Sequence, residues 1–113
     1  MKIFDDLISG GPSIFYDPNF RVMIEDHLTY LKNLPENTII EVTPGHAYKH
    51  AGDFYGLLME YSVLPHHHWI TMRVNDMVTP FDYKDDMLSF VRVDDTSIER
   101  LRSTYMSQRK IKK

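Results

Sequence analysis

The sequence has no cysteine among its 113 residues. That absence excludes a disulfide scaffold, a thiol nucleophile and a zinc site with cysteine ligands. No apolar run approaches the roughly 18 residues that a membrane-spanning helix requires. Acidic residues stand near the start of the chain, where a secretory signal would need its apolar segment. We therefore expect a soluble intracellular protein that does not contact a membrane.

The sequence has five glycines and six prolines, and it has no internal repeat or low-complexity segment. The hydrophobic fraction of 42% and the charged fraction of 26% are typical of a globular protein. A chain of this length can build one core but not two. The sequence thus predicts a single folded domain.

Charge is distributed unevenly along the chain. Residues 1–96 carry 7 basic and 15 acidic residues, whereas residues 97–113 carry 6 basic residues and one acidic residue. Such a basic end can contact an acidic neighbour, another subunit or nucleic acid, although a solvated terminus is an equally simple interpretation. Because a nucleic-acid-binding domain normally carries basic residues on its folded part, we do not expect nucleic acid as the partner. The candidate interface residues here are Arg109, Lys110, Lys112 and Lys113.

Residues 1–37 are predicted to form an apolar arm followed by a helix. Asp17 before Pro18 is a typical helix start, and apolar residues then recur at helical spacing, so the predicted helix covers residues 18–33. The arm packs either on its own domain or on a neighbouring protein, because leaving a large apolar side chain in water costs roughly 1.5–3 kcal/mol. Its candidate interface residues are Phe4, Leu7, Ile8, Phe15 and Tyr16.

Residues 38–94 are predicted to form a β-α-α-β unit. The β-branched runs at residues 38–43 and 87–93 indicate two strands that pair with each other. Between them, a regular apolar stripe over residues 47–61 predicts a helix. The alternative is a break near Gly52, after which Asp53 would cap a second segment.

The second helix of this unit begins after Pro65 and contains the only tryptophan, Trp69. It ends in an Asn-Asp pair that is followed by a turn-like run. We expect Trp69 to anchor the core from this helix. The residues predicted to define the core are Trp69, Asn75, Asp76, Phe54 and Leu58.

Residues 95–113 are predicted to form a last helix with a basic tail. Thr96 and Glu99 have the spacing of a capping box, and Asp95 is a competing cap. The expected fold class is therefore α+β, with a small β-α-α-β core, an added N-terminal helix and a C-terminal helix.

Among the residue types in this sequence, histidine gives the strongest indication of a metal site. His66 to His68 are consecutive, and because successive helical residues point about 100° apart, three in a row cannot converge on one ion. His46 and His50 can share one helix face. A metal-dependent enzyme that uses this pair with one of His66 to His68 is an alternative. The sequence has no nucleophile elbow and no phosphate-binding glycine loop. We therefore expect no enzyme activity, no cofactor and no metal.

The order strand, two helices and strand over residues 38–94 resembles the LysM fold, in which an asparagine characteristically ends the second helix, as Asn75 does here. The segment from Trp69 to Asp76, followed by Pro80, is similar to LysM-like baseplate wedge subunits of contractile-tailed bacteriophages. Further matches in the preceding helix are Ala47, Ala51, Tyr55 and Gly56. The resemblance covers about half of the chain. One departure is Gly45-His46, where true LysM repeats commonly have Gly-Asp.

This resemblance implies a structural virion protein that joins neighbouring subunits in a phage tail baseplate. Its partners would be other baseplate or tail proteins in a large assembly, and it would be made in the host cytoplasm. No small-molecule substrate is implied. The alternative is a LysM-like module that binds the glycan of peptidoglycan.

Overall fold

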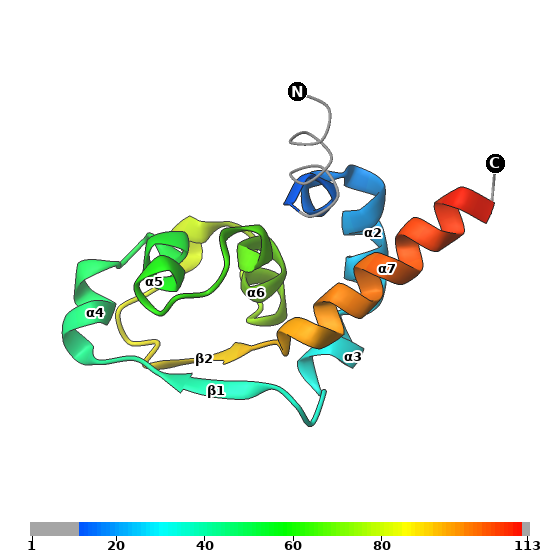
Figure 1. The fold of residues 1–113 in the computed structure, drawn as a ribbon. Helices are drawn as coiled ribbons and strands as arrows, with labels where there is room; N and C mark the ends of the chain where they lie inside the picture. The colour runs from blue at the N-terminus through cyan, green and yellow to red at the C-terminus, as the bar shows by residue number, and fades with distance from the viewer. Residues whose placement is uncertain (1–11, 112–113) are drawn as a thin grey trace.

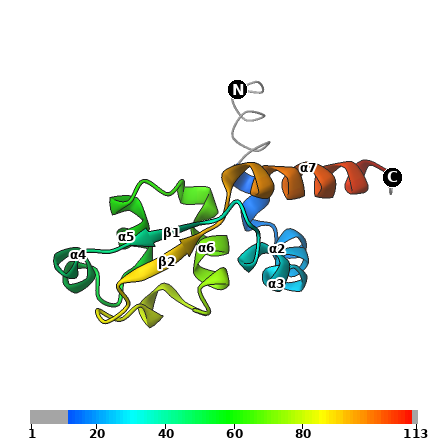
Figure 2. The ribbon, with the colours of Figure 1, turned by 90° about the horizontal axis from the view of Figure 1, so that it is seen from below.

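Two short strands pair in the computed structural model, which describes residues 12–111. Strand β1 (Thr38–Glu41) lies antiparallel to β2 (Ser89–Arg92), with Ile40 opposite Phe90. The helices between the strands cover one face of this sheet, as Figures 1 and 2 together show. The pairing that the sequence predicts is confirmed, although each strand is shorter than expected.

The rest of the described chain is mostly helical. The elements before the sheet are η1 (Pro12–Tyr16), α2 (Pro18–Asp26) and α3 (Leu28–Lys32). Those between the strands are α4 (Pro44–Lys49), α5 (Phe54–Glu60), η2 (Pro65–His67), α6 (His68–Val74) and η3 (Pro80–Asp82), and α7 (Asp95–Ile111) follows β2. The protein is therefore a small α+β domain, as predicted. In the described region, no helix combines the length and apolar character needed to cross a membrane.

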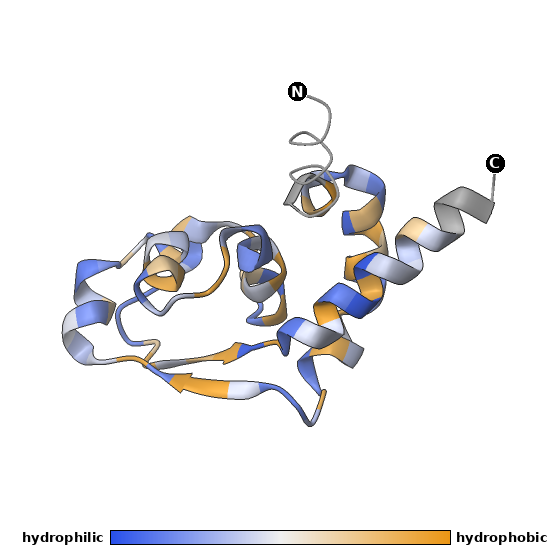
Figure 3. Ribbon diagram, viewed as in Figure 1, coloured by the Kyte–Doolittle hydropathy of each residue, from blue (hydrophilic) through white to orange (hydrophobic). Residues whose placement is uncertain are grey.

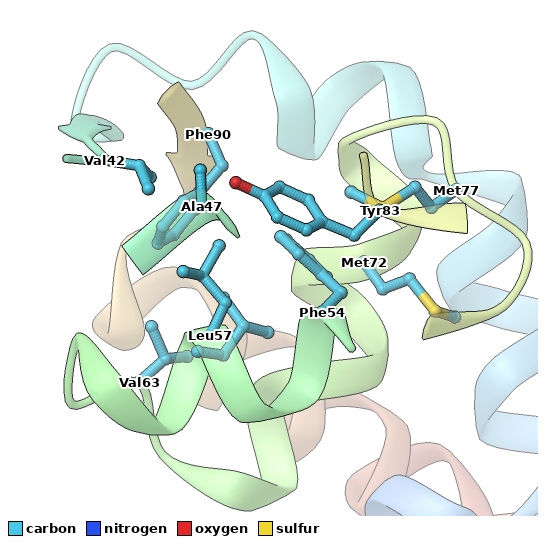
Figure 4. Close-up of a cluster of buried hydrophobic side chains, with 10 residues drawn as sticks. Val42, Ala47, Phe54, Leu57, Val63, Met72, Met77, Tyr83 and Phe90 are labelled. Carbon is cyan, nitrogen blue, oxygen red and sulfur yellow. The ribbon is translucent and has the colours of Figure 1, made fainter. Parts of the chain in front are cut away.

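One cluster of buried side chains lies between the sheet and the helices that cover it (Figure 4). Phe54 is at its centre, with its ring stacked on Tyr83 at 5.5 Å and edge-on to Phe90 at 5.8 Å between ring centroids. Leu58, one turn further along α5, is also fully buried. Phe54 and Leu58 therefore lie in the core, where the sequence places them.

A second buried cluster joins the N-terminal helices to α7 and to α6. It contains Phe20 and Ile24 from α2, together with Ile70 and Val74 from α6. Met72 of the same α6 lies in the first cluster. Helix α6 is thus packed on both sides and has no single interior face. It connects the sheet-and-helix unit to the N- and C-terminal helices.

The apolar stripe over residues 47–61 forms two helices rather than one, which is the alternative that the sequence allows. Gly52 takes a φ of +75°, a conformation that ends the α4 segment. The side chain of Asp53 then accepts a hydrogen bond from the Gly56 N–H at 3.0 Å. A Cβ at Gly56 would lie 2.1 Å from the Asp53 carboxylate, so the cap itself requires glycine there.

Two other helices also differ from the sequence predictions. The predicted helix over residues 18–33 is divided at His27, whose ring bonds the carbonyl oxygen of Met23 at 2.8 Å. Helix α7 is capped by Asp94, which accepts from the N–H of Ser97 at 3.0 Å and from its hydroxyl at 3.2 Å. Neither Thr96 nor Asp95 is the cap.

Helix α7 extends away from the rest of the domain in both ribbon views (Figures 1 and 2). Colouring by hydropathy shows few apolar residues along it (Figure 3). Ile98 is buried in the second cluster, and Leu101 and Tyr105 pack against that cluster. The narrow apolar seam that the sequence predicts therefore holds α7 to the N-terminal helices.

The ion pair between Glu25 of α2 and Arg73 of α6 should make stability depend on pH. Arg73 donates two hydrogen bonds to the Glu25 carboxylate, one of them at 2.9 Å, and these bonds lower the pKa of Glu25. A carboxyl pKa that is lower in the folded state stabilises the fold above the unfolded pKa, near about 4.3, and this contribution is lost as the pH falls through the folded pKa.

Glu25→Gln should therefore lower the free energy of unfolding by about 0.5–1 kcal/mol at neutral pH, a small value because the pair is partly exposed. Urea unfolding of both proteins at about pH 7 and about pH 3 would measure this difference. We expect it to shrink at the lower pH. An equal difference at both pH values would show that the ionised carboxylate is not what stabilises the fold.

Candidate functional site

The described surface contains a hollow of about 370 Å³ where η1 and α2 meet α5, η2 and α6. Aromatic side chains form much of its wall, and a single arginine reaches into it. The lining residues are Tyr16, Arg21, Tyr55, Gly56, Met59, Pro65, His66, His68 and Trp69. These residues come from segments far apart in the sequence, so the hollow exists only in the folded chain.

Trp69 is half-buried and packs against both core clusters. It therefore contacts the core from α6, but it is only half-buried because one side of its ring faces the hollow. The Arg21 guanidinium lies 4.6 Å from the Trp69 ring centroid and 5.4 Å from that of Tyr16. Arg21 also donates to the Phe15 carbonyl oxygen at 3.0 Å. These contacts fix a cation between two aromatic rings.

Burial shifts the pKa of two other polar groups of the hollow in the direction that favours the neutral form. Desolvation raises the pKa of the Tyr55 hydroxyl and lowers the pKa of the His68 imidazole. The His68 Nε2 lies 2.9 Å from the Val63 carbonyl oxygen, so this nitrogen carries the proton and donates it. His68 is therefore a structural residue. Arg21 supplies the positive charge of the hollow.

The rim of the hollow exposes apolar surface. Tyr16 is 57% exposed and Met59 is 59% exposed. Tyrosine, tryptophan, methionine and arginine are the residue types enriched at protein interfaces, where they form most of the energetically important contacts. The composition of the hollow therefore favours binding of a protein.

The structure separates the interface residues predicted for the N-terminal arm. Tyr16 lies at the rim of the hollow, but Phe15 is buried against Phe20 and His67 in its own chain, so it is not available to a partner. This correction follows from the turn η1, which folds the end of the arm onto the domain. The remaining candidates, Phe4, Leu7, Ile8, Lys112 and Lys113, and the side chains of Arg109 and Lys110, lie outside the described residues.

Asn75 joins helix α6 to the outer edge of strand β2. Its side-chain NH₂ donates to the carbonyl oxygen of Val91 at 2.9 Å, and its side-chain oxygen accepts from the N–H of Val91 at 2.8 Å. The same NH₂ donates to the Thr71 carbonyl oxygen at 2.7 Å, at the end of α6. An asparagine can form all three bonds because its amide carries both donors and acceptors.

Asp76 is exposed, so it is not a core residue in the sense that the sequence predicts. It contributes through its backbone, with a φ of +67°, which turns the chain after α6. Aspartate adopts this conformation more readily than most residues do. Its carboxylate also bonds the Lys32 ammonium at 2.8 Å.

The histidines of the alternative metal-dependent enzyme do not form one group. His50 bonds Glu60 at 3.0 Å, and His46 lies 3.8 Å from the same carboxylate. Hydrogen bonds from His50 and Lys49 lower the pKa of Glu60. His66 and His67 instead gather around Glu99 of α7. The two histidine groups therefore have different carboxylate partners.

Sequence reasoning missed Arg21, Tyr55 and Met59 as members of a site. In the sequence, Arg21 is typical of the polar face of an amphipathic helix. Tyr55 and Met59 are typical of helix residues next to an apolar stripe. Comparison with protein-family models, with curated proteins and with solved structures found no match to this chain.

Proposed function

We propose that this chain is a structural virion protein that joins neighbouring subunits in a phage tail baseplate and acts by binding. The observation that carries the proposal is the hollow formed by Tyr16, Arg21, Tyr55, Met59 and Trp69. Its wall combines a fixed cation with partly exposed aromatic and thioether surface. A neighbouring subunit would insert an apolar side chain here, beside an acidic group that pairs with Arg21.

The arrangement around the sheet supports the LysM-like part of this proposal. Strand β1, the three helices α4, α5 and α6, and strand β2 follow each other along the chain, with α4 and α5 together in the place of the first helix of a β-α-α-β unit. Asn75 ends the last of these helices and bonds the backbone of β2. An asparagine at the end of the second helix is the feature on which the resemblance to baseplate wedge subunits depends.

The substitution Met59→Asp tests the hollow as the docking surface. A carboxylate placed at the rim would lose its hydration in the interface, which we expect to lower incorporation into particles by about tenfold or more, the equivalent of about 1.4 kcal/mol. The measurement is the copy number of the chain per purified particle, by quantitative mass spectrometry, when each variant complements a phage that lacks the gene.

Val22→Asp is the matched control for this substitution. Val22 is 60% exposed on helix α2 and does not line the hollow. The substitution therefore also replaces an exposed apolar side chain with a carboxylate, but outside the hollow. We expect the control to be incorporated normally, and both variants to have the circular dichroism of the parent protein. Normal incorporation of Met59→Asp would contradict the docking surface. Flanking genes that encode no tail tube, sheath or spike protein would contradict the baseplate role itself.

Glycan binding is the second candidate, and the aromatic rings of the hollow favour it, because aromatic faces pack well against apolar faces of ligands. A LysM-like glycan site would instead include the region of residues 44–46. A peptidoglycan pull-down separates these possibilities: retention of the protein, lost on substitution within residues 44–46, would support glycan binding over assembly.

A further inference from the structure

Two histidines and one glutamate converge on the side of the domain where η2 meets α7. His66 and His67 belong to the 3₁₀ turn η2, and Glu99 lies on α7. One ligand atom from each residue lies within 4.8 Å of the others. The Glu99 Oε2 atom is 3.3 Å from the His67 Nε2 and 4.0 Å from the His66 Nε2. A tight turn thus brings together two imidazoles that a regular α-helix would point apart.

The His67 ring is buried, with 1% of its surface exposed, and both of its nitrogens face carboxylates. Its Nδ1 lies 3.3 Å from Asp95 Oδ1 yet forms no well-aligned hydrogen bond, the one buried side-chain polar atom in the described chain without a bond. When the Nδ1 carries the proton of the neutral ring, the Nε2 presents a lone pair to the Glu99 carboxylate. Two electron-rich atoms then face each other, an arrangement that a cation between them would stabilise, whereas in the other neutral tautomer Nε2 donates to Glu99.

The Nε2 of His66 lies 4.0 Å from the same Glu99 oxygen, Oε2, so a second imidazole nitrogen borders the same position. Arg102 donates to the other Glu99 oxygen, Oε1, at 2.7 Å, which leaves Oε2 as the atom that faces both rings. A metal ion would satisfy both histidines and Glu99 Oε2 together.

We propose that His66 Nε2, His67 Nε2 and Glu99 Oε2 bind a zinc-class divalent cation. Tetrahedral zinc with bonds of about 2.0 Å holds its ligand atoms about 3.3 Å apart. The separation of 3.3 Å between His67 and Glu99 fits this geometry, whereas the His66 ring has to move closer to both, from 4.0 Å to Glu99 and from within 4.8 Å to His67. Imidazole with carboxylate is a ligand set for zinc rather than for Mg²⁺ or Ca²⁺, which take oxygen ligands. Water completes the coordination.

Asp95 acts behind the metal ligands as a positioning residue. Ligating histidines generally donate their other N–H to a carboxylate, which fixes the tautomer and the orientation of the ring. Asp95 Oδ1 lies in that position, 3.3 Å from His67 Nδ1. Metal binding would thus join η2 to the first turns of α7 and fix the base of that helix against the domain. This role is independent of the proposed baseplate function.

The test uses the full chain without a histidine tag, dialysed against EDTA and then titrated with Zn²⁺. We expect one equivalent to bind, measured by isothermal titration calorimetry. At a free Zn²⁺ concentration of about 100 times the Kd, the Tm should rise by about 10 °C. Mg²⁺ should give no such shift. Tetrahedral d–d absorption with Co²⁺ would report the ligand geometry without any assay of function.

His66→Gln and Glu99→Gln should each weaken Zn²⁺ binding by at least about tenfold, and Asp95→Asn by about 10–100-fold. The matched control is the double variant His46→Gln, His50→Gln, which removes the two histidines that face Glu60 and should bind Zn²⁺ as the parent does. Folding of each variant is checked by circular dichroism. Absence of saturable binding, or unchanged affinity in the His66→Gln variant, would overturn the proposal.

Discussion

Replacing Phe54 with alanine should lower the free energy of unfolding by about 3–5 kcal/mol, the usual range for removing a buried phenylalanine ring. Phe54 is fully buried at the centre of the cluster between the sheet and α5 (Figure 4). Its ring contacts Tyr83 and Phe90, which come from either side of the loop that leads into β2. The cavity left by alanine would separate the helix from the sheet. Urea-induced unfolding followed by circular dichroism measures the effect.

Phe81→Ala is the matched control, because it makes the same chemical change at a ring that is 81% exposed. We expect it to change the free energy of unfolding by no more than about 0.5 kcal/mol. If Phe54→Ala lowered the free energy of unfolding as little as Phe81→Ala does, this cluster would not be what stabilises the domain.

Replacing Asn75 with alanine should lower the free energy of unfolding by about 2–3 kcal/mol, because it leaves backbone groups of β2 without hydrogen-bond partners. The N–H and C=O of Val91 both bond the Asn75 side chain, and Val91 is only partly exposed. Removing the amide also frees the edge of β2 from the end of α6. Besides the loss of stability, the amide hydrogen of Val91 should exchange faster with solvent.

Asn33→Ala separates this effect from the general contribution of a helix-ending asparagine. Asn33 ends α3 and donates to the Thr29 carbonyl oxygen at 2.9 Å, as Asn75 does to Thr71 at 2.7 Å. It lacks the bonds to a strand, so we expect a cost of only about 0.5–1 kcal/mol. An equal decrease in the free energy of unfolding at the two positions would show that the hydrogen bonds to β2 do not stabilise the fold.

Helix starts are the features that neighbouring residues specify most directly. Asp17 before Pro18 caps α2, with its side chain accepting from the N–H of Asn19 at 3.1 Å. Thr43 before Pro44 caps α4 through the N–H of His46 at 3.2 Å. Both caps were predictable because the capping atom and the free N–H lie within three residues of each other.

The cap of α7 shows where such local reasoning stops. Asp94, Asp95 and Thr96 are adjacent, and each has a side chain that can cap a helix. The choice is made by Asn37, whose side-chain oxygen accepts from the N–H of Asp94 at 3.1 Å. Asn37 also donates to the Leu31 carbonyl oxygen at the end of α3. A residue 57 positions away in the sequence thus fixes Asp94 as the cap.

By itself, the sequence determined which segments are strands and which are helical, although not where the helical segments divide. It also determined the caps at Asp17 and Thr43 and the burial of Phe54 and Leu58. These follow from periodicity and from hydrogen bonds between near neighbours. Only the tertiary structure decided that Trp69 faces a hollow with Arg21, and that His67 meets Glu99, 32 residues further along the chain. Spacing specifies which residues share one element, whereas the packing of elements specifies which residues meet across them.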